Sequence, residues 1–388
     1  MTDLLLLDAD GRRRSEPLRD VGPAAVPTEP LRSRVVYAAA HVIPKPAADN
    51  TPGAPADLDW DATLAFRHHI WSHGLGVADA MDTAQRNMGL DAVATRELIR
   101  RSAAEAQSVR GAVVVGVNTD HVELEAISLD EVVRAYVQQL EFTEDAGAGV
   151  VLMASRHLAR AASSPADYER VYAAVLERAG APVILHWLGA AFDPALEGYF
   201  GGEDAAATLI RIIEAHPDKV AGVKMSLLDA AAEIDVRSRL PRSAAMFTGD
   251  DFHYVDLIRG DGTQQPGHFS HALLGAFAAV APLAARAVRA LDAGDTDGYE
   301  RILRPTEALS RQIFAAPTFY YKTGVAFLSW LNGHQVSPAM VGGLHCARSL
   351  PHLSEIVRLA NAAGALEDPQ LAVRRWHALL ALHGVVGK

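Results

Sequence analysis

An alternation of short apolar segments with amphipathic segments over residues 34–294 is the feature that most constrains the fold of this chain. Each apolar segment has strand length and ends at turn-forming residues, and most are followed by a segment with helical periodicity. Strands that alternate with helices in this way are typical of parallel sheets. Eight repeats fit a closed (β/α)₈ barrel of the TIM type, which is the fold class that we predict.

The sixth strand of this series begins at Val220 and carries Lys224. The other seven predicted strands cover residues 34–41, 76–82, 112–118, 149–154, 182–187, 244–248 and 268–272. An open doubly wound sheet is the alternative α/β fold, but no glycine-rich dinucleotide-binding motif follows the first strand. Helix starts are predicted at Asp59, at Ser128 with Glu131 as a capping box, and at Pro165.

The two ends of the chain differ from this alternation. Residues 1–33 are predicted to be an N-terminal extension, in which Leu4–Leu7 runs into an Asp10-Gly11 turn signal of a hairpin. Residues 295–388 show only helical patterns and are predicted to form a C-terminal helical region. The predicted organisation is therefore an extension (1–33), a TIM barrel (34–294) and a helical appendage (295–388).

Charge and composition exclude several classes of function. The net charge of −11 argues against nucleic acid as the main partner. Cys346 is the single cysteine, so neither an intrachain disulfide nor a zinc–cysteine site can form. Leu4–Leu7 is too short for a signal peptide, and no segment approaches the roughly 20 apolar residues of a membrane span. We therefore expect a cytoplasmic protein with no membrane partner.

Lys224 is chemically the most informative residue of the predicted strands. An ammonium group in an apolar strand loses its hydration, and a desolvated lysine has a lowered pKa. A neutral amine near pH 7 is a nucleophile towards ketones. The competing interpretation is a strand-end lysine whose side chain extends to water.

Polar residues recur at the predicted strand ends, where the active site of a TIM barrel lies. They are His41, Asp79, Asp82, Asn118, Asp120, His121, Ser155, His157, His186, Lys224, Asp250, Asp251, Ser270 and His271. Lys224 and His186 stand out because they lie inside the apolar runs of consecutive strands. A lysine nucleophile and a neighbouring imidazole that transfers protons can together carry out Schiff-base chemistry.

Several segments carry a resemblance to a known family. They are Pro182–Trp187, Val220–Lys224, Thr248–Asp251, Ala126–Leu129 and Pro317–Lys322. Over roughly residues 34–340 the chain resembles the dihydrodipicolinate synthase / N-acetylneuraminate lyase family of class I aldolases. The resemblance implies that Lys224 is the imine-forming lysine. It also places His186 and His157 where the family has two tyrosines.

The chain departs from the family at the loop after the second strand. The family has a Gly-Thr-Thr-Gly-Glu loop that binds the carboxylate of pyruvate, and here the stretch is Asp82-Thr83-Ala84-Gln85-Arg86. Only Thr83 is retained, and a carboxylate replaces a glycine. The chain therefore resembles a divergent branch, for which a sugar-derived or other polyhydroxylated carbonyl substrate fits better than a role in lysine biosynthesis.

The resulting hypothesis is a lyase or aldolase that needs neither a metal nor a cofactor and acts on a small carbonyl substrate. The predicted catalytic residues are Lys224, His186 and His157, and the predicted substrate-binding residues are Asp82, Thr83, Asn118, Asp250, Asp251 and Ser270. Barrels with appended helices often pair through them, so a homo-oligomer, either a dimer or a tetramer, is expected.

Two other functions stay open at this point. One is a metal-dependent barrel hydrolase or isomerase whose ligands come from His41, Asp82, His121, His186, Asp250 and His271, although no pair shows a compact ligand spacing. The other is a sensor that binds a sugar acid without turnover. His69 is expected at a helix surface, and Tyr321 and Lys322 are expected to pack at a helix or subunit contact.

Overall fold

The computed structural model describes residues 3–19, 30–263 and 265–385. Its centre is a closed barrel of eight parallel strands in the order β10-β3-β4-β5-β6-β7-β8-β9. The strands are β3 (Val36–Ala39), β4 (Gly76–Asp79), β5 (Val113–Val117), β6 (Gly149–Met153), β7 (Val183–Leu188), β8 (Val220–Ser226), β9 (Ala245–Thr248) and β10 (His271–Leu274). The predicted (β/α)₈ barrel is confirmed.

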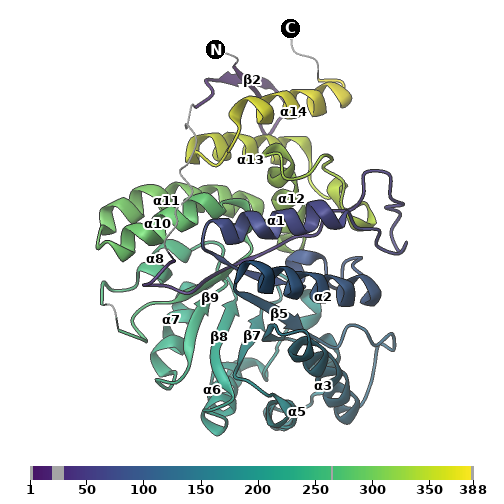
Figure 1. Ribbon diagram of the computed structural model, residues 1–388, viewed down its shortest axis with the longest axis vertical. Coiled ribbons are helices and arrows are strands. Elements are labelled where there is room, and N and C mark those ends of the chain that lie inside the picture. Colours follow the sequence, from purple (N-terminus) through teal and green to yellow (C-terminus); the bar gives the residue numbers. More distant parts are fainter. Residues whose placement is uncertain (1–2, 20–29, 264, 386–388) are drawn as a thin grey trace.

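Helices surround the barrel and continue into the C-terminal region (Figure 1). Those that alternate with the strands are α1 (Trp60–Ser72), α2 (Ala92–Val109), α3 (Leu129–Asp145), α4 (Arg156–Ala161), α5 (Pro165–Arg178), α6 (Ala205–Ala215), α7 (Ala230–Arg239), α8 (Tyr254–Arg259), α9 (Ala276–Ala279) and α10 (Ala281–Asp292). The C-terminal helices are α11 (Thr296–Ile313), α12 (Tyr321–Leu331), α13 (Leu350–Ala363) and α14 (Pro369–Leu382).

The helix starts follow from local capping chemistry. The Asp59 side chain accepts a hydrogen bond from the backbone N–H of Ala62 at the start of α1. Ser128 and Glu131 form the predicted capping box at the start of α3, and Pro165 occupies the first turn of α5. Each device satisfies N–H groups that have no partner within the helix, so these starts could be located from the sequence.

The eighth strand lies later in the chain than predicted. Residues 268–272 were expected, whereas β10 covers His271–Leu274. The preceding residues belong to a turn, in which the His268 ring bonds to the Asp261 carboxylate at 2.7 Å. In the sequence, His268 and Phe269 resemble the start of a strand. In the structure, the Phe269 ring packs against the Arg34 guanidinium, with 3.6 Å between the ring centre and Cζ.

The N-terminal hairpin packs on the C-terminal helices rather than on the barrel. Strands β1 (Leu4–Leu7) and β2 (Arg13–Glu16) pair antiparallel. The Leu7 N–H donates to Ser354 Oγ of α13 at 2.7 Å, and the Trp376 indole of α14 donates to the Leu5 carbonyl at 2.6 Å. The hairpin and α14 therefore lie together at the top of Figure 1, beyond the end of the barrel.

Helix α12 is the link between this upper layer and the barrel. All eleven of its residues, Tyr321–Leu331, are buried. It contacts the barrel side through α9 and the upper layer through α13 and α14. A helix that is buried on every side needs partners on every side, and this position supplies them.

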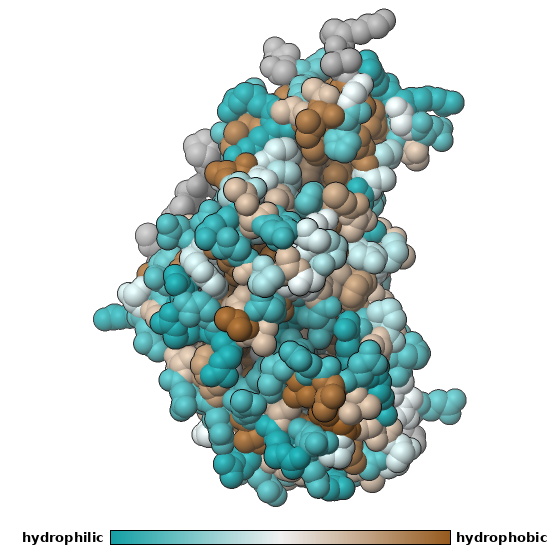
Figure 2. Space-filling model, turned by 90° about the vertical axis from the view of Figure 1, so that its right-hand side faces the viewer, coloured by the Kyte–Doolittle hydropathy of each residue, from teal (hydrophilic) through white to brown (hydrophobic). Residues whose placement is uncertain are grey.

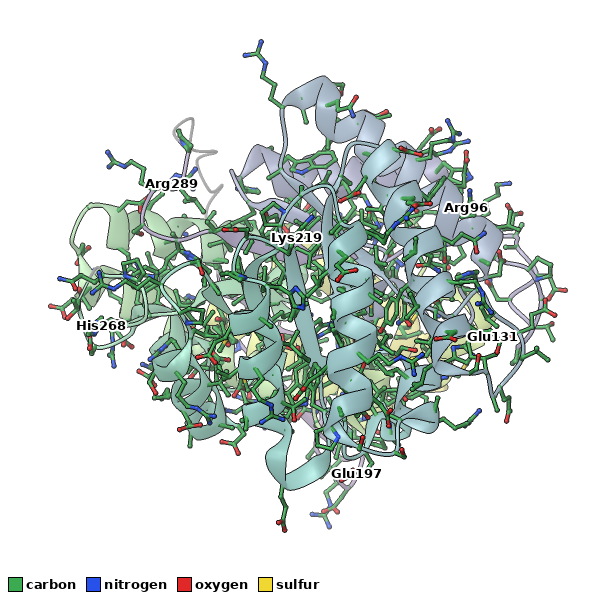
Figure 3. All side chains as sticks on the ribbon, turned by 90° about the horizontal axis from the view of Figure 1, so that it is seen from below. Arg96, Glu131, Glu197, Lys219, His268 and Arg289 are labelled. Carbon is green, nitrogen blue, oxygen red and sulfur yellow. The ribbon has the colours of Figure 1, made fainter. Side chains whose placement is uncertain are left out.

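The surface is mostly polar. Figure 2 shows polar side chains over most of one face, with apolar ones in separate small groups. Seen from below, Arg96, Glu131 and His268 lie at the periphery of the molecule (Figure 3). No helix in the described part of the chain is long and apolar enough to cross a membrane.

Candidate active site

Lys224 lies on the inner face of β8, between β7 and β9. In the register of the barrel it is opposite His186 on β7 and Phe247 on β9. Lys224 and His186, which were predicted to be close, therefore lie opposite each other on adjacent strands. The lysine is 4% exposed, and Nζ makes neither a hydrogen bond nor an ion pair with the residues that the structure describes.

Burial controls the protonation of this pair. It lowers the pKa of the Lys224 amine from its usual 10.5, and the nearby carboxylates of Asp82 and Asp251 only partly reverse this shift. Burial and the charge of Lys224 also hold the pKa of His186 well below 6.5. The imidazole is therefore neutral at pH 7, and the amine loses its proton more easily than an exposed lysine does.

Ser226 adds a hydroxyl group to this inner face. Its Oγ lies 3.2 Å from Nε2 of His186, and Nδ1 of the same ring is buried without a partner among the described residues. Residues two apart on a strand share a face, so Ser226 points into the barrel as Lys224 does. The sequence analysis missed Ser226, although this period of two was the available signal.

Gly249 leaves the space that the Lys224 side chain occupies. A Cβ at this position would lie 2.2 Å from Ser226 Oγ and 3.0 Å from Cε of Lys224. No side chain fits there without moving the site. The glycine of the Gly-Asp-Asp segment is therefore explained by the close approach of β8.

The two aspartates that follow have different surroundings. Asp250 accepts from the backbone N–H of Phe252 and His253 and lies 2.8 Å from His253 Nδ1, so it holds its own loop. Asp251 is buried and accepts from the Ala276 N–H at 2.9 Å. Burial raises its pKa well above 3.8, against the opposing charge of Lys224. Of the two, Asp251 is the one that interacts with the lysine.

Asp82 joins the barrel site to the C-terminal region. The Tyr321 hydroxyl donates to Asp82 Oδ2 at 2.7 Å and lies 2.6 Å from Thr83 Oγ1. Nζ of Lys322 lies 3.7 Å from the same Asp82 oxygen, and burial lowers its pKa to about 8. Tyr321 and Lys322, expected to be packing residues, thus contact two of the predicted substrate-binding residues.

A narrow cavity opens beside Asp82. It is lined by Asp82, Arg86, Asn87, Asn118, Met153, Ala154, Arg156, Leu188, Phe192, Asp193, Phe319 and Lys322. The predicted residue Asn118 is therefore part of its wall, and Nε of Arg156 bonds to Asp193 at 2.7 Å. Asp82 is shared between this cavity and the surroundings of Lys224. The cavity volume of about 10 Å³ is enough for one water molecule, and the cationic groups of Arg156 and Lys322 lie beside the carboxylates of Asp193 and Asp82.

Arg86 is fully engaged within the protein. Its guanidinium donates to both carboxylate oxygens of Asp120, to the carbonyl groups of Ala80 and Gly116, and to the Gln139 side chain. An arginine has five N–H donors, and all five are used here. Arg86 therefore fixes the shape of the loop after β4, and none of its donors is left for a substrate carboxylate.

The loop after β4 has a strained backbone. Ala80, Gln85 and Asn87 have positive φ angles of 47°, 66° and 59°. Non-glycine residues in this region cost on the order of 1 kcal/mol each and concentrate at functional sites. The loop that carries Asp82 and Thr83 is therefore held in an unfavourable conformation by its surroundings, in part by Arg86.

Two predicted site residues lie elsewhere. Nδ1 of His157 lies 2.7 Å from Thr119 Oγ1 and its Nε2 lies 2.9 Å from the Leu124 carbonyl oxygen, so both ring nitrogens hold the loop after β5. Ser270 precedes β10 and faces the helices, where it donates to Glu233 and accepts from Arg237 of α7. His271 faces the barrel interior, so its neighbour Ser270 must face outward.

The predicted metal ligands are not brought together either. Nε2 of His41 bonds to Gln335 at 2.8 Å, and the ring of His271 contacts Phe247. Asp79, a strand-end residue outside this set, forms a buried ion pair with Arg67. Among the described residues, none of the strand-end histidines belongs to a cluster of three metal-ligating groups. The histidines and aspartates proposed as ligands of a metal-dependent barrel enzyme therefore do not converge on one point.

Comparisons with known proteins agree with this architecture. A family model described as "Protein of unknown function (DUF993)" matches residues 4–385. A search of curated proteins found no match. Among solved structures, the chain is similar to a prophage protein of the dihydrodipicolinic acid synthase family from E. coli K12 in complex with pyruvate. That similarity has a TM-score of 0.67 at 16% identity and covers 86% of this chain and 99% of that chain.

Two further solved structures support the same fold. Dihydrodipicolinate synthase from Thermotoga maritima has a TM-score of 0.63 at 13% identity, over 86% of this chain and 100% of that chain. The synthase from Aquifex aeolicus has a TM-score of 0.62 at 13% identity, over 92% and 99%. The resemblance in fold to the dihydrodipicolinate synthase family is confirmed, and the low identity agrees with a divergent branch.

Proposed function

The chain belongs to the DUF993 family, and we propose that it is a Schiff-base-forming lyase of the class I aldolase type that acts on a carbonyl substrate. One observation carries the proposal. Lys224 presents an amine on the inner face of the barrel, buried, with a lowered pKa and without a hydrogen-bond partner among the described residues. A lysine in this state is a nucleophile rather than a structural cation.

The proposed reaction begins with attack of the neutral Lys224 Nζ on the carbonyl carbon of the substrate. The resulting carbinolamine loses water to give a protonated imine. A base then removes the proton of the hydroxyl group on the β-carbon, the Cα–Cβ bond breaks, and the β-fragment leaves as an aldehyde. The electron pair of that bond forms an enamine, which takes up a proton at Cα before hydrolysis of the imine frees Lys224. His186 and Ser226, which lie within hydrogen-bond distance of each other, move the protons in this proposal.

The other groups of the site fit substrate binding. Asp82 and the Tyr321 hydroxyl are placed to bind hydroxyl groups, and Lys322 is placed to bind an anionic group. Thr83 is held by Tyr321, so its hydroxyl has a fixed position. A sugar-derived keto acid combines these features, and pyruvate, which the E. coli relative binds in its solved structure, is the simplest keto acid to test.

Borohydride trapping tests the proposal directly. The protein is incubated with pyruvate or with members of a panel of keto-sugars and sugar-derived keto acids, then reduced and digested with trypsin. The chain has five lysines, and a reduced adduct blocks cleavage at the lysine that carries it. We expect the adduct on the peptide 220–237, which contains Lys224.

Lys322 is the internal control for this mapping, because its pKa is also lowered and its peptide, 312–348, is distinct. An adduct on 312–348 alone would move the nucleophile to α12 and overturn the assignment of Lys224. The absence of any adduct across the panel, with turnover that depends on an added metal, would overturn the Schiff-base mechanism itself.

Tyr321→Phe tests whether α12 contributes to the site. The variant removes the hydroxyl that bonds to Asp82 and Thr83 but keeps the ring, which stacks on Phe314 at 4.3 Å. We expect the rate of imine trapping to fall by about 10-fold or more, because Asp82 and Thr83 lose their position beside the substrate. The stability should fall by only about 1–3 kcal/mol. An unchanged trapping rate and KM would contradict a role for Tyr321 in the site.

A further inference from the structure

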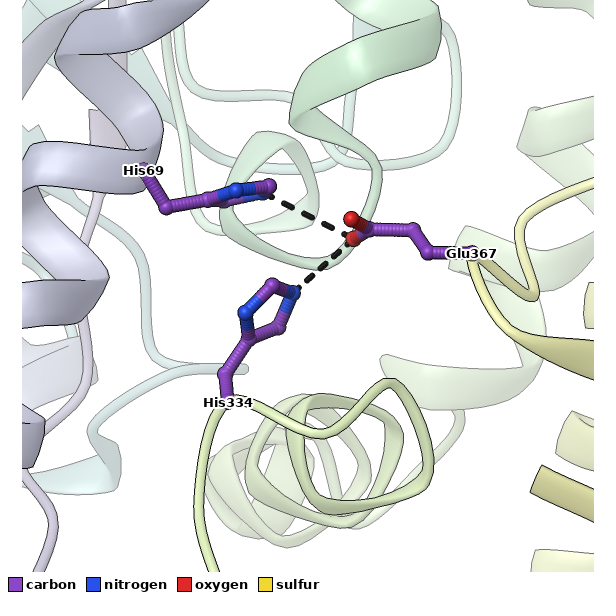
Figure 4. A group of neighbouring side chains, drawn as sticks. All are labelled: His69, His334 and Glu367. Carbon is purple, nitrogen blue, oxygen red and sulfur yellow. Dashed lines mark hydrogen bonds and ion pairs between the residues drawn. The ribbon is translucent and has the colours of Figure 1, made fainter. Parts of the chain in front are cut away.

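A second cluster of titratable side chains lies away from the strands of the barrel. His69, His334 and Glu367 converge so that one ligand atom of each lies within 4.8 Å of the others. Nε2 of His334 is 2.9 Å from Oε1 of Glu367, and Nε2 of His69 is 3.6 Å from the same oxygen. Figure 4 shows both rings directed at the carboxylate.

The three residues come from segments that are far apart in the sequence. His69 is in the last turn of α1, His334 follows α12, and Glu367 lies between α13 and α14. The cluster therefore bridges a barrel helix and the C-terminal region. Helix α1 was expected to present His69 to solvent, but its side chain is only 18% exposed because this region covers it.

The spacing of these atoms fits a zinc ion. Zinc bound tetrahedrally at about 2.0–2.1 Å keeps its ligand atoms roughly 3.4 Å apart. The two distances to Glu367, 2.9 and 3.6 Å, lie on either side of that value. Two imidazoles and one carboxylate are also an established zinc ligand set that leaves one position open.

The surroundings hold the ligands in place. The Asn332 side chain donates to Glu367 Oε1 at 3.5 Å, and its Oδ1 accepts from the Glu367 backbone N–H at 3.1 Å. The ring of Phe66 packs against His69 and His334. The ring of His73 packs edge-on against that of His69, with 4.9 Å between the ring centres. Such supporting contacts orient metal ligands in known sites.

We propose that His69, His334 and Glu367 bind one Zn²⁺ per chain and that this ion fastens the C-terminal helical region to helix α1. The ion replaces the hydrogen bond between His334 and Glu367 and the 3.6 Å contact between His69 and Glu367. Because the region it fastens contains α12, the site stabilises the arrangement that brings Tyr321 and Lys322 to Asp82. The two sites share no residue, so zinc binding can be measured without the Schiff-base reaction.

The test uses the untagged full chain, stripped with EDTA and titrated with ZnCl₂ in a calorimeter. We expect one equivalent to bind to the wild type and to raise Tm. Loss of an outer-shell partner alone typically weakens metal affinity about 10–100-fold, so His334→Gln and Glu367→Gln should each weaken binding by at least about 100-fold. His68→Gln is the matched control, because His68 neighbours His69 on α1 but bonds to Glu105 instead.

A spectroscopic measurement covers the case in which a variant fails to fold. Co²⁺ in place of Zn²⁺ gives visible d–d absorption whose intensity reports a four- or five-coordinate site in the wild-type protein. This absorption should disappear in His334→Gln and persist in His68→Gln. If the wild type shows no such band, or if both variants bind Zn²⁺ as the wild type does, the proposed site is wrong.

Discussion

Replacing Lys224 with methionine is expected to abolish imine trapping and to lower turnover by about 10⁴-fold or more, the range seen when a covalent nucleophile is removed. Methionine fills a similar volume but has no amine. The same variant should be more stable than the wild type, because the buried amine has no hydrogen-bond partner among the described residues and pays a desolvation cost that methionine does not. Trapping assays and urea unfolding measure the two effects on one sample.

The pH dependence of this stabilisation has a definite sign. The folded-state pKa of Lys224 lies below the ordinary value of 10.5, so the unfolded chain binds more protons between the two values. The destabilisation by Lys224 is therefore complete below its folded pKa and disappears as the pH rises towards 10.5. The stability gained in Lys224→Met should shrink over that range, and a gain that grows with pH would contradict the lowered pKa.

Lys219→Arg is the matched control for the activity loss. Lys219 directly precedes β8, and its Nζ donates to the Ala179 carbonyl, a contact that arginine can keep. This variant should retain trapping at Lys224. If Lys224→Met retained turnover while Lys219→Arg lost it, Lys224 could not be the nucleophile.

Asp79→Asn is expected to lower the free energy of unfolding by about 3–5 kcal/mol, the usual cost of breaking a buried ion pair on one side. Asp79 and Arg67 are both 0% exposed and form a bidentate pair at 2.9 and 3.0 Å. The Arg67 guanidinium also donates to the carbonyl groups of His41 and Thr63. Asparagine would leave this cation buried without a counter-charge. Urea denaturation measures the loss.

Two controls separate this ion pair from general effects of charge. Glu105→Gln breaks the half-exposed pair with His68 and should cost no more than about 1 kcal/mol. A double replacement, Arg67→Met with Asp79→Leu, should recover much of the stability lost in Asp79→Asn, because neither charge then remains buried. If Asp79→Asn lowered the free energy of unfolding by less than about 1 kcal/mol, the ion pair would contribute little to stability.

The strands and helix starts were predictable because their signals are local. The cap at Asp59 depends on neighbouring residues, and the strands that begin at Val183 and Val220 are short, nearly continuous apolar runs, as is typical of a parallel sheet covered on both faces. The prediction was wrong where a local signal was ambiguous. Aromatic residues near position 269 resembled a strand, but β10 begins three residues later than predicted, and Ser270, which precedes it, bonds to Glu233 of α7 instead of facing the barrel interior.

The role of His157 shows a different limit. The strand-end rule placed it correctly near the rim, but a rule of position says nothing about hydrogen-bond partners. Both ring nitrogens are used by Thr119 and Leu124, and neither partner is recognisable from the sequence around His157. The same rule could not include Tyr321 and Lys322, since they come from a helix beyond the barrel.

The sequence by itself determined the eightfold alternation, the position of Lys224 on the strand next to that of His186, and the absence of an intrachain disulfide. Only the tertiary structure decided that Tyr321 bonds to Asp82 and that His69 meets His334 and Glu367. The physical reason is the separation in sequence of the residues that interact. Strand period and helix caps are set by residues a few positions apart, whereas the docking of α12–α14 depends on packing between segments that lie hundreds of residues apart in the chain.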